Sequence, residues 1–302
     1  MGSGHSHSAG MQNRPQLIRA LLLGLSIVVV QVLGAAWSNS LALLADAAHT
    51  LTDVAGIGLA VAAITVAAKP TKPHRTYGLY RIEIIATIAN GLLLLGLSAY
   101  ILFEAVQRWE SPEAVKPGIM IAAALYGVVV NGISLAMLKR GSGESLAVKG
   151  AYLEVLSDTL GSLGVVLAGF VVLFTGFDRA DVVVSVAIAL FMIPRTVLLL
   201  REALGVLMEN APRELDLEQM KTDMLAVPGV TSLHDMHVWT ITSGLVAMSC
   251  HVTVTADPFT GGCGSAILDD LQDLLHDRYG VEHSTLQLEP PAHAEHESGS
   301  HA

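Results

Sequence analysis

The feature of this sequence that most limits its fold is a series of long apolar segments. Each has the roughly 20 residues that a helix needs to cross the hydrocarbon core of a bilayer. Short stretches of turn-forming residues separate them. The segments are Leu17–Trp37, Leu41–Ala68, Ile82–Val106, Gly118–Leu138, Ala151–Phe174 and Val182–Leu200. The pattern predicts a polytopic α-helical membrane protein with six transmembrane helices.

The composition agrees with a membrane protein and argues against several other classes. Of the 302 residues, 52% are hydrophobic and only 15% are charged, with a mean hydropathy of +0.55. A formal net charge of −10 without a basic stripe excludes nucleic acid as a partner. Cys250 and Cys263 do not form a CxxC pair, so we expect no disulfide framework or thiolate zinc site and interpret them as a small core residue and a loop thiol.

The distribution of lysine and arginine predicts the orientation in the membrane, because these residues concentrate in cytoplasmic loops. The end of the bundle that carries the N-terminus also carries the basic loops after the second and fourth segments. Its basic residues are Arg14, Arg19, Lys69, Lys72, Arg75, Arg81, Lys139, Arg140 and Lys149, against Arg108, Lys116 and Arg179 at the other end. We therefore expect both termini in the cytoplasm.

Two of the apolar segments carry ionisable residues that are costly inside a bilayer and therefore indicate function. His49 and Asp53 are four residues apart in the second segment, and Glu154 and Asp158 have the same spacing in the fifth. Residues at this spacing share one face of a helix. If the two helices face each other, one imidazole and three carboxylates converge on one point, which predicts a tetrahedral metal site. Asp46, on the same face, is interpreted as a group on the path of the metal, as a capping residue or as a hydrogen-bond partner of a neighbouring helix.

After about residue 204 the sequence changes to the pattern of a small soluble domain. It predicts a helix from Leu215 to Leu225, two strands at Val230–Ile241 and Leu245–Thr255, a helix at Ser265–Tyr279 and a strand at Glu282–Leu288. In the second strand, alternate residues from Val246 to Val254 face one side. We expect an α+β domain of the ferredoxin-like, metallochaperone-like class. The predicted divisions are a disordered 1–14, a transmembrane 15–204, a cytoplasmic 205–290 and a disordered tail 291–302.

Several motifs together make the sequence resemble the cation diffusion facilitator family, the six-helix zinc/proton exchangers. They are SLALLADAAHTLTD at 40–53, YGLYRIE at 77–83, LSD at 156–158 with GS at 161–162, and HVWTIT at 237–242. The resemblance implies that His49, Asp53, Glu154 and Asp158 form the transport site. Glu154 departs from the family's usual histidine. We expect three carboxylates to broaden metal choice, and Glu154 or His49 to lose a proton when metal binds.

The soluble domain is rich in histidine, and the resemblance implies that it binds regulatory zinc and pairs two chains into a homodimer. The candidate ligands are His234, His251, Glu289 and His283. His237 is interpreted as structural. Asn90 and Asn131, single amides in the third and fourth apolar segments, are expected to pack between helices.

The predicted function is export of Zn²⁺, and of other divalent ions such as Cd²⁺ or Co²⁺, from the cytoplasm in exchange for protons. The expected setting is the lipid bilayer of a bacterial plasma membrane, with alternating access to the site. Alternatives are an exporter preferring Mn²⁺ or Fe²⁺, a passive channel and a membrane-bound metal sensor. An intramembrane metalloenzyme is disfavoured because the sequence has no HExxH-type signature and four protein ligands would fill the coordination sphere.

Overall fold

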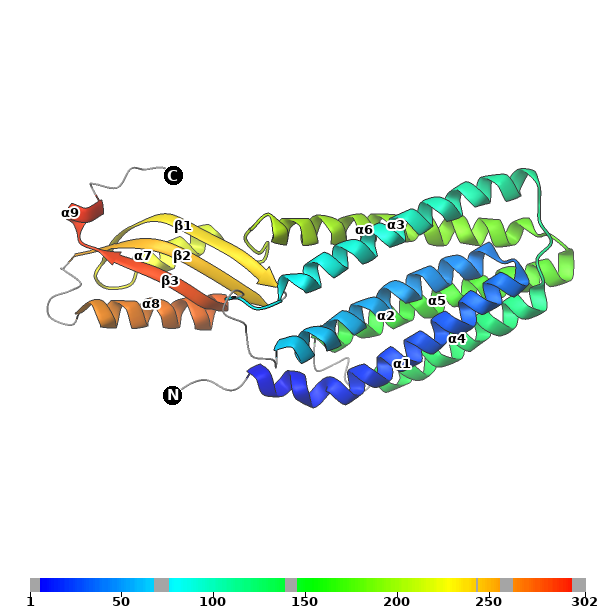
Figure 1. Cartoon of the computed structure of the whole chain (residues 1–302), viewed down its shortest axis with the longest axis horizontal. Helices are drawn as coiled ribbons and strands as arrows, with labels where there is room; N and C mark the ends of the chain where they lie inside the picture. Colours follow the sequence, from blue (N-terminus) through cyan, green and yellow to red (C-terminus); the bar gives the residue numbers. More distant parts are fainter. Residues whose placement is uncertain (1–5, 68–75, 139–145, 243, 256–262, 295–302) are drawn as a thin grey trace. The chain divides into compact units, whose positions relative to one another are not determined.

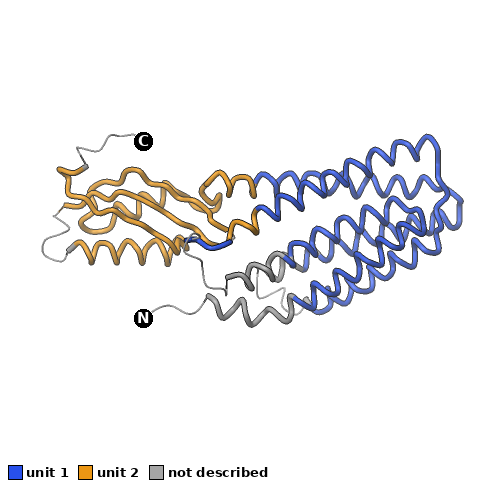
Figure 2. The backbone as a smooth tube through the Cα atoms, viewed as in Figure 1, with its two compact units in different colours: residues 1–79, 85–201 blue, residues 80–84, 202–302 orange. Residues whose placement is uncertain are grey.

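The computed structural model describes residues 6–67, 76–138, 146–242, 244–255 and 263–294. Within these ranges, the side chains of 6–17, 57, 59–67, 138, 146–151, 154, 263 and 294 lie outside the described part. The chain divides into two compact units (Figure 2). The first comprises Met1–Leu79 and Ile85–Arg201, and the second comprises Tyr80–Ile84 and Glu202–Ala302.

Each of the predicted apolar segments lies in a helix (Figure 1). The helices are α1 (Ser6–Ser38), α2 (Leu41–Ala67), α3 (Arg81–Glu110), α4 (Pro117–Leu138), α5 (Leu146–Thr175) and α6 (Arg179–Leu207). Among the described residues, five helices are long and apolar enough to cross a membrane, and α2, which contains Asp46 and Asp53, is not among them. α1 begins at Ser6, so residues 6–14 are helical where the sequence predicted disorder. An established helix extends at little further cost, because each added residue brings one hydrogen bond.

Small side chains allow four of these helices to pack closely. α1, α2, α4 and α5 contact one another (Figure 1). Their shared core contains Ala42, Ala124, Val165 and other small or β-branched residues. Small residues allow close approach of helix backbones, which is how helices associate where lipid removes the hydrophobic driving force. Large apolar side chains such as Phe174 are exposed instead, as expected for surfaces that face lipid.

A carboxylate from another helix fixes the beginning of α2. Asp181, near the start of α6, accepts hydrogen bonds from the Leu41 amide at 2.6 Å, the Ala42 amide at 3.2 Å and the Ser40 hydroxyl at 2.5 Å. These amides belong to the first turn of α2, where no intrahelical partner exists. Asp181 therefore caps α2 from α6, although the sequence predicted only a connecting loop there.

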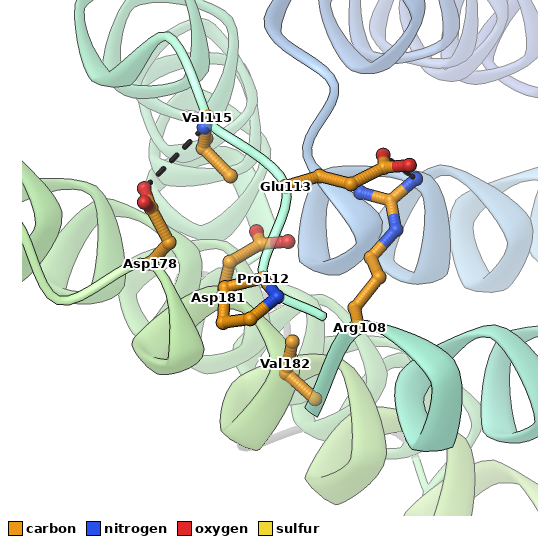
Figure 3. Close-up of a pocket in the computed structure, with 7 residues that line it drawn as sticks. All are labelled: Arg108, Pro112, Glu113, Val115, Asp178, Asp181 and Val182. Carbon is orange, nitrogen blue, oxygen red and sulfur yellow. Dashed lines mark hydrogen bonds and ion pairs between the residues drawn. The ribbon is translucent and has the colours of Figure 1, made fainter. Parts of the chain in front are cut away.

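The same end of the unit contains a pocket (Figure 3). Its lining residues come from the loops that join α3 to α4 and α5 to α6, and from the helix ends beside these loops. In it the Val115 amide donates to Asp178 at 3.3 Å, and Arg108 forms an ion pair with Glu113 at 3.4 Å. Arg108 also donates to the carbonyl oxygen of Asn39 at 2.7 Å. Asn39 has a φ of 60°, a conformation that Asn tolerates better than most residues. These contacts hold the predicted turn between α1 and α2.

The second unit has the predicted order of helix, strand, strand, helix, strand. Its elements are α7 (Leu217–Leu225), β1 (Val230–Thr242), β2 (Leu245–Val254), α8 (Cys263–Tyr279), β3 (Val281–Glu289) and the short α9 (Pro291–Ala294). β2 lies between an antiparallel β1 and a parallel β3. Of the predicted disordered tail, 291–294 forms a helical turn and 295–302 lies outside the described residues. The sheet has three strands in the described part of the chain, and the ferredoxin-like class remains a prediction.

One face of this sheet is covered and carries the hydrophobic core. Met248, Cys250, Val252 and Val254 of β2 are buried against α7 and α8, as their alternation predicted. α7 begins after Asp216, whose side chain accepts from the Gln219 amide as an N-cap. The intervening residues of β2, including His251, point to the opposite face. Functional side chains on that face are thus separated from the core by the sheet itself.

Two polar residues at the start of α3 also belong to the second unit. Arg81 forms an ion pair with Glu209 at 3.0 Å, and Glu83 accepts a hydrogen bond from the Thr242 hydroxyl at 2.6 Å. These contacts connect the start of α3 to other residues of the second unit.

Candidate metal sites

Three predicted ligands of the transport site come together between α2 and α5. His49 Nε2 lies 3.1 Å from Asp158 Oδ1, and His49 Nδ1 lies 4.0 Å from Asp53 Oδ2. One candidate ligand atom from each of the three residues lies within 4.8 Å of the others. The helical spacing places His49 and Asp53 on one face of α2, and the contact between α2 and α5 brings Asp158 to that face.

The burial of these side chains fits a site for an ion. His49 is 8% exposed and Asp158 is 7% exposed. Although His49 Nε2 and Asp158 Oδ1 are close, neither makes a well-aligned hydrogen bond among the described residues. Tetrahedral ligands at about 2.0–2.2 Å from a zinc ion lie about 3.4 Å from one another. The cluster is therefore close to the dimensions of a divalent metal site.

Glu154 is one helical turn before Asp158 in α5, as the sequence spacing requires. Its side chain lies outside the described part of the structure. Its role as the fourth ligand therefore remains a prediction.

A buried hydrogen-bond network lies one turn from the cluster, toward the start of α2. Asp46 Oδ2 accepts from Gln31 Nε2 of α1 and from Ser162 Oγ of α5, each at 2.6 Å. A side chain at Gly127 would come within 3.0 Å of Gln31 Nε2, and one at Gly161 within 3.2 Å of Asp46 Oδ1. The two glycines thus make room for the network.

These bonds agree with the prediction of an interhelical hydrogen bond at Asp46, and its place on the path of the metal stays a prediction. Gln31 was not among the predicted site residues, although a single amide within an otherwise apolar segment is a recognisable signal. Together Asp46, Gln31 and Ser162 connect the two helices that carry the candidate ligands to α1.

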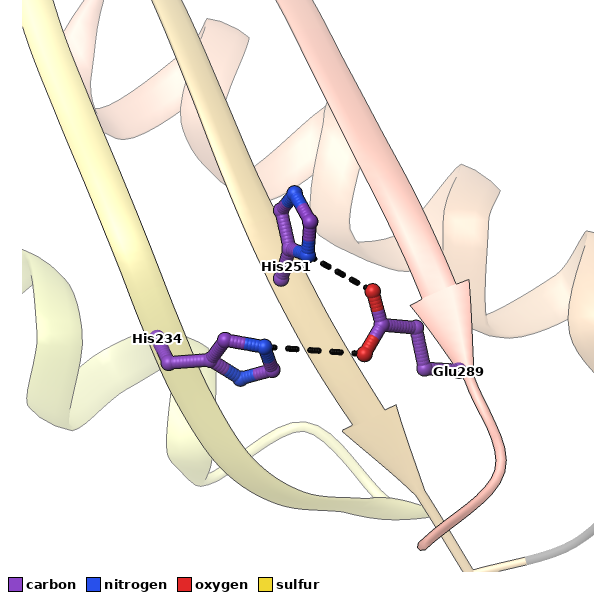
Figure 4. A group of neighbouring side chains, drawn as sticks. All are labelled: His234, His251 and Glu289. Atoms are coloured by element: carbon purple, nitrogen blue, oxygen red, sulfur yellow. Dashed lines mark ion pairs between the residues drawn. The ribbon is translucent and has the colours of Figure 1, made fainter. Parts of the chain in front are cut away.

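A second candidate site lies on the uncovered face of the sheet (Figure 4). His251 Nδ1 lies 2.7 Å from Glu289 Oε1, and His234 Nε2 lies 3.5 Å from Glu289 Oε2. The two imidazole rings are 5.0 Å apart between centroids. Glu289 is 1% exposed and its Oε2 makes no hydrogen bond among the described residues. Two imidazoles and a buried carboxylate are suitable ligands for zinc.

Strand register explains how these three residues meet. His234 is directly opposite His251 in the antiparallel pair, and Glu289 is opposite Thr253, two residues from His251 in the parallel pair. An irregularity between His234 and His237, with Asp235 at a φ of 50°, interrupts β1 beside the site. His237 lies 3.0 Å from Asp235 on the other side of this bulge. It is not in the cluster, in agreement with its structural interpretation.

His283 is the predicted ligand of this group that the structure places elsewhere. It is paired with Ala247, four residues along β2 from His251, a distance of about 13 Å at the usual rise per residue. It is exposed and is not in the described cluster. His283 shares the face of the sheet with the other three residues, but register along the strand separates it from them.

Cys250 is next to His251 in sequence but faces the core. It is 1% exposed, and its thiol donates to backbone carbonyl oxygens of His234 and His251. Burial raises the pKa of this thiol to about 12. Since metals bind the thiolate, the protonated Cys250 is a poor ligand at neutral pH. It is the core residue that the sequence predicted, while the side chain of Cys263 lies outside the described part.

The sequence matches two known domain families along almost its whole length. Residues 17–208 match the cation efflux transmembrane domain, and residues 212–291 match the cytoplasmic domain of cation efflux proteins. The solved metal-bound C-terminal domain of the CzcD transporter from Cupriavidus metallidurans is 33% identical in sequence, covering 25% of this chain and 99% of that chain with a TM-score of 0.23.

Several full-length relatives are similar over nearly their entire sequences. The metal cation efflux system protein CzcD of Cupriavidus metallidurans is 41% identical, over 96% of this chain and 90% of that protein. The cadmium, cobalt and zinc/H(+)-K(+) antiporter of Bacillus subtilis is 34% identical, over 96% and 93%. The zinc transporter ZitB of Escherichia coli is 35% identical, over 97% and 94%. From the matched domains and the extent of these similarities, the chain belongs to the cation diffusion facilitator family of metal cation efflux transporters.

Proposed function

We propose that this protein exports zinc from the cytoplasm in exchange for protons. The observation that carries the proposal is the approach of His49 Nε2 to Asp158 Oδ1 at 3.1 Å, with Asp53 beside them. These residues come from two different helices, so a relative movement of α2 and α5 would assemble or open the site. Ionisable side chains inside a membrane are rare and mark ion pathways, which supports transport over a purely structural role.

The ligand set favours zinc and permits related ions. One imidazole and two described carboxylates suit zinc, and Glu154 would add a third carboxylate as the fourth ligand. None of these is a thiolate, a ligand that would also favour Cu(I). Relatives are named for zinc, cadmium and cobalt, and this chain is proposed to carry the same group. A preference for Mn²⁺ or Fe²⁺ is the alternative that a harder, carboxylate-rich site would support.

The chemistry of the ligands supports the proposed exchange with protons. Metal binding requires deprotonated carboxylates and a neutral imidazole, so it releases protons. His49 or Glu154 is proposed to carry a proton in the metal-free site. The proposed mechanism is alternating access in a bundle of six spans, with α2 as the sixth. Both termini are proposed to lie in the cytoplasm, with the bundle in a bacterial plasma membrane.

The sheet cluster is proposed as a regulatory zinc site in a homodimer. His234 and His251 supply nitrogens and the buried Glu289 supplies an oxygen with no other hydrogen-bond partner among the described residues. The matched cytoplasmic domain belongs to a family named for dimerisation. Zinc bound here would report the cytoplasmic metal level to the transport unit.

The decisive experiment is metal flux into proteoliposomes that contain the purified full-length protein. With an imposed pH gradient, the wild type should transport zinc, and Asp158→Ala should reduce flux by at least about 100-fold, beyond the loss expected for a group outside the ligand set. Asp178→Ala, which removes a carboxylate at the pocket end of the same unit, is the matched control and should retain flux. Retained flux in Asp158→Ala would overturn the proposed site.

The same assay separates the alternative functions. A passive channel would conduct zinc equally well without a pH gradient, and a sensor would show no flux even as wild type. Parallel measurements with Cd²⁺, Co²⁺, Mn²⁺ and Fe²⁺ would rank the transported metals.

A further inference from the structure

Asn131 of α4 is a buried polar residue that is not among the proposed metal ligands. It is only 7% exposed, and its amide Nδ2 makes no hydrogen bond within the described part of the chain. Burying an amide donor without a partner is unfavourable, and more so in a bilayer, which has no water to replace the bond. The expected interhelical packing of Asn131 therefore does not account for its donor.

The contacts between α4 and α5 place Asn131 at the level of Asp158. A side chain at Gly127 of α4 would lie 3.3 Å from Ser162 Oγ of α5, and one at Gly169 of α5 would lie 2.6 Å from Ile121 of α4. The later residue of α4, Gly127, is beside the earlier residue of α5, Ser162, so the two helices are antiparallel. One turn from Gly127 along α4 is Asn131, and one turn back from Ser162 along α5 is Asp158.

The two side chains are chemically complementary. Asp158 Oδ1 is a buried acceptor and Asn131 Nδ2 is a buried donor, and neither makes a hydrogen bond among the described residues. A carboxylate can bind a metal with one oxygen while it accepts a hydrogen bond with the other, and such bonds orient metal ligands. A hydrogen bond between the two residues would satisfy the buried donor of Asn131 and leave Asp158 an oxygen for the metal.

We propose that Asn131 is a positioning residue of the transport site, donating a hydrogen bond to Asp158 and so directing that carboxylate at the bound metal. The inference rests on the proposed function, because it assigns Asp158 to the transported ion. It adds a third helix, α4, to the two that carry the candidate ligands. It also assigns metal selectivity partly to α4, because a fixed carboxylate suits a small ion such as zinc, whereas a looser one accommodates the larger cadmium ion.

The test is zinc and cadmium transport by Asn131→Leu in the full-length protein, in proteoliposomes with an imposed pH gradient. Leucine keeps the volume and removes the donor. We expect the KM for zinc to rise by about 10–100-fold, the usual effect of losing a group that orients a metal ligand. The KM for cadmium should rise less, and the maximal rate should change less than the KM for zinc. Loss of folded protein alone would lower the maximal rate of both metals equally and leave both KM values unchanged.

Two further variants keep the test decisive. Asn131→Ser retains a donor and should recover part of the zinc affinity, and it remains informative if Asn131→Leu folds poorly. Ser134→Ala is the matched control in the same helix, because the Ser134 hydroxyl already donates to the carbonyl oxygen of Val130, and it should leave both KM values unchanged. Wild-type KM values in both Asn131 variants, with flux abolished in Asp158→Ala, would overturn this inference alone. Flux retained in Asp158→Ala would overturn the proposed function instead.

Discussion

The two candidate metal sites use similar ligands but hold them in different ways. In the membrane unit, helical spacing and the contact of α2 with α5 bring His49, Asp53 and Asp158 together. In the second unit, strand register brings together His234, His251 and Glu289. A helix pair can slide or tilt without breaking its own hydrogen bonds, whereas adjacent strands are fixed to each other by theirs. The first arrangement suits a site that must open to release its ion, and the second suits a site that keeps one geometry.

The two sites also differ in how deeply their candidate ligands are buried. His49 and Asp158 are both buried, and the Asp46 network lies against them. In the sheet cluster only Glu289 is buried, while both histidines remain partly exposed. A metal ion can therefore reach the sheet cluster directly from solvent. The comparison predicts that variants will separate metal transport from metal sensing.

Among the variants that test this difference between the two sites, Glu289→Gln should have the largest effect. The substitution keeps the shape of the side chain and removes the charge between the two histidines. Zinc affinity of the sheet cluster should fall by about 100-fold, at the upper end of losses for groups around a metal. Isothermal titration of full-length protein with Asp158→Ala in the background isolates this cluster.

His283→Ala is the matched control for this variant, since His283 lies on the same face but far along the strand. It should change zinc affinity by less than about twofold, within normal variation for a surface substitution. In the transport assay, Glu289→Gln alone should retain the maximal rate and lose activation by cytoplasmic zinc. A transport site equally damaged by Glu289→Gln would show that the two sites are not separable.

An intermediate effect is expected from Asp46→Asn in the network beside the membrane site. Asn is the same size, but its neutral amide oxygen accepts weaker hydrogen bonds from Gln31 and Ser162 than the Asp46 carboxylate does. Hydrogen bonds to a charged group contribute about 1.5–3 kcal/mol each and neutral ones about 0.5–1.5 kcal/mol, so the midpoint of thermal unfolding in detergent should fall by roughly 2–10 °C.

Thr50→Val provides the matched control in the same helix. The Thr50 hydroxyl donates to the carbonyl oxygen of Asp46 at 3.0 Å and makes only a long 3.4 Å contact with Gln31. Its removal should shift the midpoint by less than Asp46→Asn does. If both variants melt like the wild type, the network does not stabilise the contact between the helices.

The smallest effect is expected from Cys250→Ala. With a pKa raised by burial to about 12, this thiol stays protonated at neutral pH, so zinc affinity of the sheet cluster should change by less than about twofold. Alkylation with iodoacetamide at pH 8, followed by mass spectrometry in a Cys263→Ser background, should leave Cys250 unmodified in the folded protein. Rapid alkylation, or a large loss of zinc affinity in Cys250→Ala, would show that the thiol takes part in the site.

Much of the fold was predictable because its signals are local. The length of each apolar segment predicted the helices of the membrane unit, and alternation in β2 predicted which residues face α7 and α8. The spacing of His49 and Asp53 likewise indicates a shared helix face without reference to the rest of the chain. The cost of burying charge in a bilayer was enough to predict that α5 supplies a partner carboxylate, which is Asp158 in the described cluster.

What the sequence did not predict depends on contacts between distant segments. Asp181 looked like a loop residue because nothing nearby in sequence shows that it caps α2. Gln31 and Ser162 become informative only when helices α1, α2 and α5 are placed together. His283 lies on the same face of the sheet as the cluster, but its distance from the cluster follows from the register between β2 and β3, which the sequence does not show.

The cap that Asp181 places on α2 has a mechanical consequence. Because the carboxylate of α6 holds the first amides of α2 directly, the beginnings of these two helices cannot separate without leaving those amides without a partner. If α2 tilts to open the site around its imidazole, its first turn would therefore stay with the start of α6, and the displacement would be largest at its other end, near Ala67.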